Sequence, residues 1–380
     1  MTATLYAYAF LDEFVLLYPV YALLFADTGL SVGQISSLFV LWSLTGVLLE
    51  VPSGAWADAV SRRLPLCLGP LLGGAGFALW VCFPSYGAFA AGFVLWGVRG
   101  ALGSGALEAL VYEELERLGA ADRYARVMGR SHAAGQVAVM AAMGLAGPVF
   151  AVGGYPAVGA ASVLACVLCA ATATRFPEHR TSPEHGGGGG WAATLRAGLA
   201  DAHRDRSVRG ALLLVPAVAA VWGALDEYTS LLVRDTGVTE AAVPYWLMLI
   251  WAGVTAGSLL SGLAERLGPT GLAALLTGSA LALGVGALTR APAGIGLVAL
   301  AFGGFQLATV VADARLQRRI EGTGRATLTS VASLGTEVLT IGVYGAYGAL
   351  GSALPHGTVF ALCAVPYLVT AVGVAWGRRR

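Results

Sequence analysis

The chain carries long runs of apolar residues, each about 20 residues in length and separated by polar segments. A run of this length matches an α-helix that crosses the hydrocarbon core of a bilayer. The runs do not alternate between apolar and polar positions, so helices are favoured over the strands of a barrel. The pattern predicts an all-α membrane protein with twelve transmembrane helices, near residues 4–26, 33–57, 63–83, 87–110, 131–152, 156–174, 210–233, 240–263, 269–289, 293–315, 326–350 and 355–376.

The segment over residues 175–209 differs from the other connections. It is polar and rich in arginine, and it contains five consecutive glycines. Such a composition is typical of a flexible linker. Because it divides the predicted spans six and six, we expect an N-terminal six-helix bundle over 1–175, a cytoplasmic linker over 176–209 and a C-terminal six-helix bundle over 210–380.

The two halves of the chain share short motifs in the same order. Leu11–Phe14 recurs as Leu225–Tyr228, Asp27–Gly29 as Asp235–Gly237, and Ser53–Gly54 as Ser261–Gly262. The last two pairs share one spacing, and a six-residue difference within the first and seventh spans reconciles the first pair with them. The motifs therefore predict a duplicated six-helix unit. Since six is even, both copies have the same orientation in the membrane, which is a parallel repeat.

The arginines indicate the orientation. The chain has 23 basic residues, all arginine, and twenty of them fall in segments on the side of the two termini. Arg234 and Arg290 fall on the opposite side, and Arg99 lies within a span. Basic residues accumulate on the cytoplasmic side of membrane proteins. We therefore expect both termini in the cytoplasm and a multi-pass protein of the cell (inner) membrane.

Composition supports a lipid environment. Only 12% of the residues are charged, and the mean hydropathy is +0.73. The first span contains acidic residues and lacks a basic leader, so we expect a retained span and not a cleaved signal peptide. The five cysteines fall in apolar runs, where they fill space. The sequence has no phosphate-binding loop, nucleotide motif or metal-binding pattern. This argues against ATP-driven transport, a cofactor, a metal or a nucleic-acid partner.

Residues 50–63 end the second span and form the connection to the third, and the notable positions are Glu50, Gly54, Asp58, Ser61, Arg62 and Arg63. Gly54 permits the close approach of another helix, and Asp58 can pair with Arg62 or Arg63. The segment resembles the signature Gly-x-x-x-Asp-x-x-Gly-Arg-Arg/Lys of the major facilitator superfamily, with Ser61 in place of the second glycine. The resemblance implies a transporter in which this cluster is a latch between the two bundles on the cytoplasmic side. The alternative is a basic anchor with an incidental acid.

Two further runs resemble signatures of the same family. Arg99 begins Arg-Gly-Ala-Leu-Gly-Ser-Gly-Ala in the fourth span, which is similar to a signature of proton-coupled members. Leu102 departs from that signature, and Arg99 could instead neutralise Asp12, Glu13 or Glu108 as a structural pair. Gly147 and Pro148 in the fifth span resemble the antiporter signature loosely, and a helix bend explains them equally well.

Asp12, Glu13, Asp226 and Glu227 are acids inside predicted spans. Ionisable residues in a membrane are costly and usually functional. Neighbouring helical positions point about 100° apart, so one acid of each pair should face a central cavity and the other a neighbouring helix. An acid in such a site can exchange protons or bind a cation. The alternative is structural pairing, with Arg99 as the nearest candidate partner.

Aromatic residues within the spans either line a cavity or lie at the membrane interface, and the sequence does not separate these roles. They are Tyr6, Tyr8, Tyr18, Tyr21, Trp42, Trp222, Tyr228, Trp246, Trp251, Phe305 and Tyr344.

These observations favour a monomeric secondary transporter that works by alternating access. The family resemblance and Arg99 indicate proton-coupled antiport that exports a drug-like or secondary-metabolite compound. The partners are then a small-molecule substrate, protons and the lipid bilayer. One alternative is a proton-coupled symporter that takes up a small nutrient. A remote one is a membrane enzyme or an accessory protein that does not transport.

Overall fold

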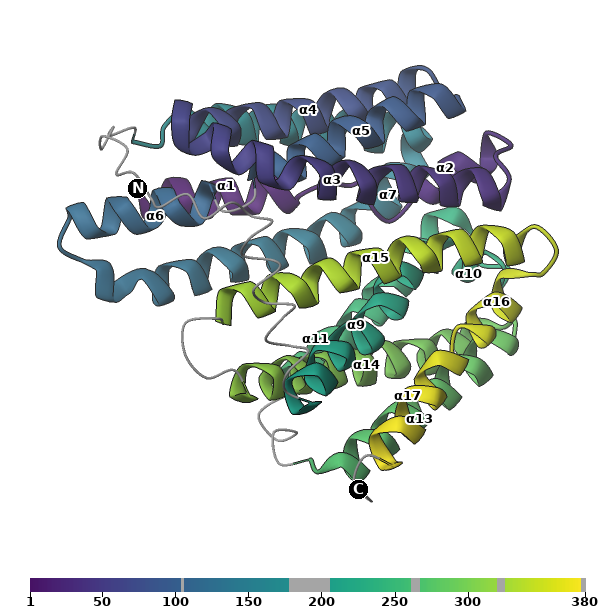
Figure 1. The fold of residues 1–380 in the computed structure, drawn as a ribbon. Coiled ribbons are helices and arrows are strands. Elements are labelled where there is room, and N and C mark those ends of the chain that lie inside the picture. Colours follow the sequence, from purple (N-terminus) through teal and green to yellow (C-terminus); the bar gives the residue numbers. More distant parts are fainter. Residues whose placement is uncertain (104–105, 178–205, 261–266, 320–324, 377–380) are drawn as a thin grey trace. The chain divides into compact units, whose positions relative to one another are not determined.

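The structure is a computed structural model that describes residues 1–103, 106–177, 206–260, 267–319 and 325–376. Every regular element in these residues is a helix, as the apolar runs predict (Figure 1). The chain forms two compact units. Unit 1 comprises Met1–Gly186 and Glu240–Tyr245, and unit 2 comprises Gly187–Thr239 and Trp246–Arg380. The predicted linker lies mostly outside the described residues, so the proposed domain boundaries stay a prediction.

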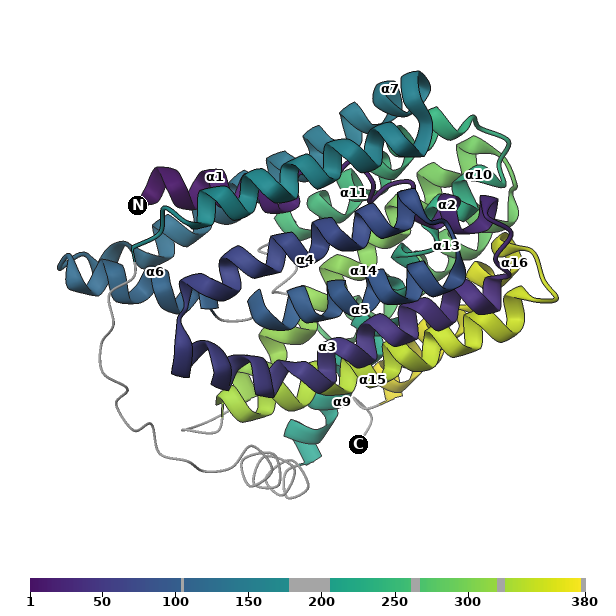
Figure 2. The ribbon, with the colours of Figure 1, turned by 90° about the horizontal axis from the view of Figure 1, so that it is seen from above.

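Unit 1 contains seven α-helices among its described residues. They are α1 (Thr2–Glu13), α2 (Tyr21–Asp27), α3 (Val32–Val60), α4 (Arg63–Cys82), α5 (Tyr86–Gly103), α6 (Ala106–Arg117) and α7 (Tyr124–Ala173), with the short 3-10 helix η1 (Ala121–Arg123) before α7. The helix α5 lies between α3 and α4 and contacts both of them (Figure 2). The helix α7 contacts α1 and α4.

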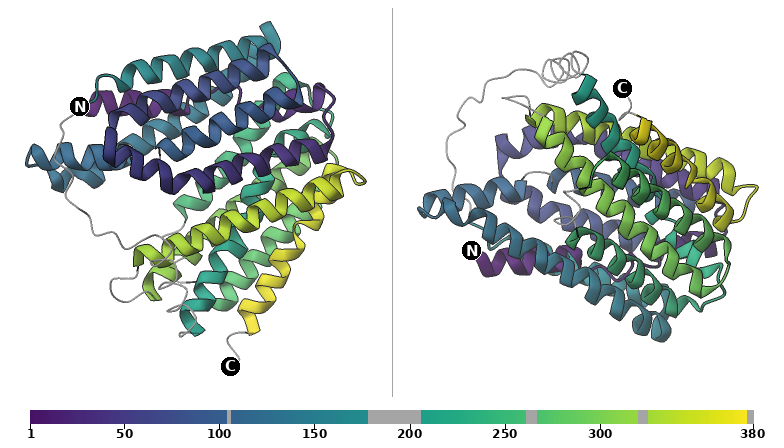
Figure 3. Two further views of the ribbon diagram at one scale, coloured as in Figure 1. Left: turned by 45° about the horizontal axis from the view of Figure 1, so that its top comes forward. Right: turned by 90° about the horizontal axis from the view of Figure 1, so that it is seen from below.

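The regular elements in the described residues of unit 2 are likewise helices. Its helices are α9 (Arg206–Asp226), α10 (Thr229–Arg234), α11 (Val243–Leu259), α13 (Pro269–Leu288), α14 (Pro292–Arg319), α15 (Arg325–Gly351), α16 (His356–Leu362) and α17 (Val365–Trp376). The 3-10 helix η2 (Glu240–Ala242), which belongs to unit 1, precedes α11. The helix α9 contacts α14 and α15, and α13 contacts α14, α16 and α17 (Figures 1 and 3).

Nine helical segments in the described parts of the chain are long and apolar enough to cross a membrane. Twelve spans were predicted, and the count of twelve stays a prediction. Three places account for the difference. The predicted span 4–26 forms two short helices, the spans 131–152 and 156–174 form one element, α7, that changes direction at Gly154, and the span 326–350, which forms α15, is not among the nine. The spans 210–233 and 355–376 are also interrupted, but each still contributes one of the nine segments. Gly154 has φ 58° and ψ −152°, a conformation that favours glycine.

The predicted repeat recurs in the local structure of both units. The helix α1 ends at Glu13 and α9 ends at Asp226, so the Asp-Glu motif marks a helix break in each unit. The Asp-Thr-Gly motif of each unit lies at the end of the short helix after the break, α2 in unit 1 and α10 in unit 2. Its glycine, Gly29 or Gly237, has a positive φ of 90° or 85°. The break covers residues 14–20 in unit 1 but only 227–228 in unit 2. This accounts for most of the six-residue difference in spacing between the Asp-Glu motifs and the other repeated motifs.

Glycines set the close packing of helices in unit 2. A Cβ atom added to Gly257 in α11 would overlap the carbonyl oxygen of Gly303 in α14, and one at Gly253 would overlap the carbonyl oxygen of Ala299. Backbones that approach this closely require small residues, as is common between membrane helices. The four residues therefore fix the α11–α14 contact.

Candidate functional site

Arg99 in α5 forms an ion pair with Asp12 at the end of α1. Its Nη2 donates to Asp12 Oδ1 at 2.6 Å and to the Asp12 carbonyl oxygen at 3.0 Å. The side chain of Arg99 is 11% exposed and that of Asp12 is 30% exposed. The carbonyl groups of the last turn of a helix lack partners within the helix, so Arg99 satisfies one of them as well as the carboxylate. Arg99 thus stabilises the broken end of α1.

Two glycines of α4 make room for the Arg99 side chain. A Cβ atom at Gly73 would lie 2.9 Å from both Cδ and Nη1 of Arg99, and one at Gly69 would lie 3.5 Å from Cγ. Among the described residues, Nη1 is a buried polar atom without a hydrogen-bond partner. The guanidinium group is therefore packed against α4 on one side and bonded to Asp12 on the other.

Asp12 and Glu13 have different surroundings, as their adjacent positions on a helix predict. The Asp12 carboxylate also accepts a weak bond from the buried thiol of Cys169, with an S···O distance of 3.8 Å. Glu13 is exposed, and its Cγ lies against α7, where a Cβ at Gly135 would be 3.2 Å away. Within the described residues, only Asp12 of this pair contacts Arg99. The structural alternative for Arg99, neutralisation of an acid, is therefore realised with Asp12.

The segment that follows α1 is anchored inside unit 1. The N–H group of Leu17 donates to Ser162 Oγ of α7 at 3.0 Å, and that hydroxyl donates to the Val158 carbonyl oxygen at 2.7 Å. Buried backbone groups must be satisfied in a membrane protein, because lipid offers no hydrogen-bond partner. Ser162 therefore replaces the intrahelical bond that the break removes.

Aromatic side chains form a wall next to Arg99. Trp96 lies one turn before Arg99 on α5, and its ring stacks on that of Tyr18 with centroids 4.9 Å apart. The ring centroid of Trp42 lies 6.0 Å from that of Trp96, and the side chains of Tyr18, Trp42 and Trp96 are half-buried. Behind them Trp80 is fully buried, and its Nε1 donates to a backbone carbonyl oxygen at 3.1 Å. The sequence indicated Tyr18 and Trp42 but missed Trp96, whose position three residues before Arg99 is the signal that places it on the same helix face.

Asp226 and Glu227 lie at the corresponding break of unit 2, and both are half-buried. Neither carboxyl group has a hydrogen bond or ion pair with any residue in the described part of the chain. A local hydrogen bond involves the backbone of this pair, since Thr229 Oγ1 donates to the Asp226 carbonyl oxygen at 2.6 Å. The arginines described in unit 2 lie at or near helix ends and connections, and Gln306 within α14 donates to Ser258 at 2.9 Å. Among the residues that the structure describes, the two acidic pairs therefore differ, since a basic partner is present in unit 1 and none in unit 2.

The predicted latch is described only in part. Arg62 pairs with Glu113 of α6 at 2.5 Å, and Arg63 donates to the Phe176 carbonyl oxygen at 3.4 Å. Both contacts lie within unit 1. Ser61 Oγ accepts from the N–H of Leu64 at 3.0 Å at the start of α4.

The side chains of Glu50, Gly54 and Asp58 lie outside the described residues, so the latch between bundles stays a prediction. Glu113 is a partner that sequence reasoning missed. The acidic run Glu113–Glu114, just after the predicted fourth span, is the sequence feature that could have indicated this acidic partner for Arg62.

The bend predicted at Gly147 and Pro148 also stays a prediction. Both residues lie inside α7, and the residue with a non-helical backbone is Gly154. The change of direction therefore follows the glycine pair Gly153–Gly154 at the end of the predicted span.

Comparison with known proteins identifies the family. The family model described as Major Facilitator Superfamily matches residues 2–354. No curated protein matches significantly. A crystal structure of the nucleoside transporter NupG aligns with a TM-score of 0.76 and 12% identity, over 100% of this chain and 99% of that one.

Two other transporters have similar folds. The peptide-family (POT) transporter PepTSo aligns with a TM-score of 0.73 and 12% identity, over 100% of this chain and 97% of that one. A bacterial homologue of the human lysosomal transporter Spinster aligns with a TM-score of 0.72 and 14% identity, over 100% and 96%. These likenesses concern the fold. Because the family model covers residues 2–354 of 380, the chain belongs to the major facilitator superfamily, a family of transporters.

Proposed function

We propose that the protein is a proton-coupled antiporter that exports a small, amphipathic, cationic compound by alternating access. The observation that carries this proposal is the pair Asp226 and Glu227, two acids at a helix break without a basic partner in the described residues. Removal of a carboxylate from water penalises its charged form unless a proton or a cation neutralises it. Each of these acids is therefore suited to bind one or the other.

The exchange follows from competition for the same oxygen atoms. A carboxyl group that has bound a proton no longer attracts a cation, and a bound cation displaces the proton. When the two ligands exclude each other, the carrier returns with one after it has released the other. An inward proton gradient then drives the cation outward, which is antiport.

Asp12 is less suited to this role than the acids of unit 2. Its carboxylate is already neutralised by Arg99 at 2.6 Å, so a proton or a cationic substrate would have to compete with a buried guanidinium group. Glu13 has no such partner among the described residues and remains a candidate. We assign Asp12 and Arg99 the role of supporting the proton-linked site and Asp226, Glu227 and Glu13 the role of exchanging ligands.

The aromatic wall of unit 1 supports an amphipathic substrate. The half-buried rings of Tyr18, Trp42 and Trp96 offer apolar faces, and aromatic faces attract both flat rings and cations. Arg99 on the same helix cannot face lipid at low cost, so this side of α5 faces protein or water. A drug-like or secondary-metabolite compound with a planar ring and a positive charge has the matching chemistry.

The remaining assignments rest on sequence and are part of the proposal. The protein lies in the cell (inner) membrane as a monomer, with both termini in the cytoplasm. The residues Glu50, Gly54, Asp58, Ser61, Arg62 and Arg63 act as the latch of the family, and Gly147 and Pro148 bend the fifth span.

The second candidate function is proton-coupled uptake of a small nutrient. It is favoured by the fold neighbours, since one is a nucleoside transporter and another a peptide transporter. In symport the proton and the substrate move in the same direction, whereas in antiport they move in opposite directions. The direction of proton movement during substrate flux therefore separates the two.

Purified protein in proteoliposomes tests the proposal. A pH-sensitive dye inside the vesicles reports proton movement when a planar aromatic cation, such as ethidium, is added on one side. Antiport predicts proton movement opposite to the cation. Asp226→Asn and Glu227→Gln should abolish it, and Glu13→Gln is tested with them. Asp122→Asn, which changes an exposed acid in η1, is the matched control and should behave as the wild type.

Three results would contradict the proposal. Substrate-dependent proton movement that persists in all of these variants and in Asp12→Asn rules out the acidic pairs as the coupling site. Movement of protons together with the substrate indicates symport. Substrate flux without any proton movement indicates facilitated diffusion.

A further inference from the structure

His356 is a half-buried histidine at the start of α16 in unit 2. Its Nδ1 lies 2.7 Å from the hydroxyl oxygen of Tyr347 in α15, within hydrogen-bond distance. The two rings are nearly parallel, with an angle of 24° and centroids 6.0 Å apart. A titratable side chain is therefore held in one defined place by a neighbouring helix.

Tyr347 connects this histidine to the helix break of unit 2. Its ring stacks on that of Tyr228, with centroids 3.7 Å apart and an angle of 16°, and both side chains are fully buried. Tyr228 is the N-cap residue of α10 and directly follows Glu227 in the chain. Tyr344, one turn before Tyr347, lies 6.2 Å from Tyr228 and within electrostatic reach of Glu227. Packed tyrosine rings thus reach from His356 to the acids.

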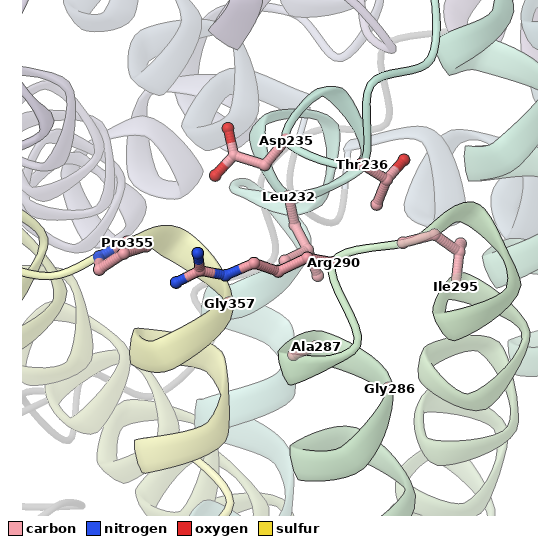
Figure 4. Close-up of a pocket in the computed structure, with 9 residues that line it drawn as sticks. All are labelled: Leu232, Asp235, Thr236, Gly286, Ala287, Arg290, Ile295, Pro355 and Gly357. Atoms are coloured by element: carbon pink, nitrogen blue, oxygen red, sulfur yellow. The ribbon is translucent and has the colours of Figure 1, made fainter.

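A pocket of about 220 Å³ opens beside His356. Pro355 and Gly357, the neighbours of His356 in the chain, line it together with Asp235, Thr236 and Arg290. Figure 4 shows these side chains, with the guanidinium group of Arg290 extended toward the segment of Pro355 and Gly357. Such a pocket is large enough and polar enough to hold water. Water there would lie next to the segment that carries His356, whose side chain is itself half-buried.

The charged groups around His356 come from two other elements. Asp235 and Arg234, at the end of α10, both lie within electrostatic reach of the imidazole, and Arg290 projects from the connection between α13 and α14. Tyr347 is the titratable group that faces it from α15. Asp235 and Arg234 therefore act on the charge of the imidazole with opposite signs, and histidine is the side chain whose charge changes most readily in the physiological pH range.

We propose that His356 is a proton-binding site at this end of unit 2 and that it conveys the pH of the adjacent solution, through Tyr347 and Tyr228, to the helix break that carries Glu227. The inference rests on the proposed function, since it concerns the protons that drive transport. Under the predicted orientation the site lies on the outer side, together with Arg234 and Arg290.

The chemical change at the site is the addition of one proton to the imidazole. In the neutral form with hydrogen on Nε2, Nδ1 accepts a hydrogen bond from the Tyr347 hydroxyl. When a proton from pocket water binds Nδ1, the Nδ1–H group donates to the Tyr347 oxygen instead. The hydroxyl hydrogen then turns to another acceptor. Tyr347 gains and loses no proton, and the positive charge stays on His356.

This switch acts on the helix break because the tyrosine rings are packed in contact. A reversed hydrogen bond changes the preferred position of the Tyr347 ring, and the ring is stacked on the residue that caps α10. Buried aromatic rings leave no free volume to absorb such a change. The break beside Glu227 therefore responds to the protonation of His356.

The experiment measures the transport rate in proteoliposomes as the pH on the His356 side varies from about 5 to 8, with the pH on the other side fixed. His356→Gln keeps a polar partner for Tyr347 but does not titrate. Tyr347→Phe keeps the ring stacked on Tyr228 but removes the hydroxyl. Both variants should lose the response to pH on that side, while the number of protons moved per substrate stays at the wild-type value. His132→Gln, at an exposed position of α7, is the control and should keep the wild-type profile.

A second measurement does not depend on transport. Diethyl pyrocarbonate modifies neutral imidazole, so mass spectrometry of the modified peptide gives a titration curve for His356. The curve gives the pH at which His356 takes up a proton, and this midpoint should shift in Tyr347→Phe relative to the wild type. An unchanged pH profile of transport in both variants, or the same modification curve in the wild type and in Tyr347→Phe, overturns the inference. A failed proposed function would be recognised separately, because the Asp226→Asn and Glu227→Gln variants would then still move protons.

Discussion

The coupling free energy between Arg99 and Asp12 should be far larger than that of a more exposed ion pair of similar length. The N···O distance of the Arg99–Asp12 pair is 2.6 Å, with side chains 11% and 30% exposed, whereas the pair Arg62–Glu113 has a distance of 2.5 Å with side chains 28% and 41% exposed. Two charges about 4 Å apart interact by about 4 kcal/mol at an effective dielectric constant near 20. Exposed pairs usually contribute about 0–1 kcal/mol. We expect coupling free energies of about 2–4 kcal/mol for Arg99–Asp12 and below about 1 kcal/mol for Arg62–Glu113.

Double-mutant cycles measure both couplings. The variants are Arg99→Met, Asp12→Asn and their combination, and Arg62→Met, Glu113→Gln and their combination. Reversible unfolding in mixed micelles with increasing dodecyl sulfate, followed by circular dichroism, gives the free energy of unfolding of each. The double variant Arg99→Met/Asp12→Asn should be more stable than the sum of the single changes predicts, because no charge is then left buried alone. A coupling for Arg99–Asp12 no larger than that for Arg62–Glu113 would refute the reasoning that burial decides the strength of the pair.

Two substitutions test the packing and the helix break. Gly257→Ala should destabilise the protein by about 1–3 kcal/mol, because its Cβ would overlap the Gly303 carbonyl oxygen, whereas Gly278→Ala, with no atom within 4 Å of the new Cβ, should change stability little; equal unfolding midpoints for the two variants would contradict this account. Ser162→Ala leaves the buried N–H of Leu17 without an acceptor and should cost about 1–3 kcal/mol of unfolding free energy. Hydrogen exchange at Leu17, measured by mass spectrometry, should become faster in that variant, and unchanged protection would show that the serine does not hold the break.

The sequence predicts where the chain crosses the membrane but not where its helices are interrupted. Apolar runs of about 20 residues identify the spans because lipid requires that length. A break inside a span keeps the same apolar composition, so hydropathy does not reveal it. The break after Glu13 and the one after Asp226 depend on partners from elsewhere, such as Ser162 in unit 1, which satisfy the freed backbone groups. The repeated Asp-Glu motif lies at both breaks, although the apolar runs predict continuous spans there.

The pairing of charged residues follows from tertiary structure alone. Arg99 had Asp12, Glu13 and Glu108 as possible partners in the sequence, and the packing of α1 and α5 around Gly73 of α4 selects Asp12. Arg62 likewise pairs with Glu113, an acid 51 positions away that no motif indicates. The range of a charge interaction is a few ångströms in space, and residues far apart in the sequence reach that range only after the helices pack.

By itself, the sequence determined that the chain is helical and apolar enough to reside in lipid, that it carries a repeat marked by the Asp-Glu motifs, and that the acids and Arg99 are exceptional. These properties depend on local composition and on the thickness of the bilayer. The tertiary structure decided which acid is neutralised, since Asp12 has Arg99 while Asp226 and Glu227 have no basic partner in the described residues. The reason is physical, because the cost of a charge in a membrane depends on the atoms within hydrogen-bond distance of it, and these are set by the packing of helices and not by the order of residues.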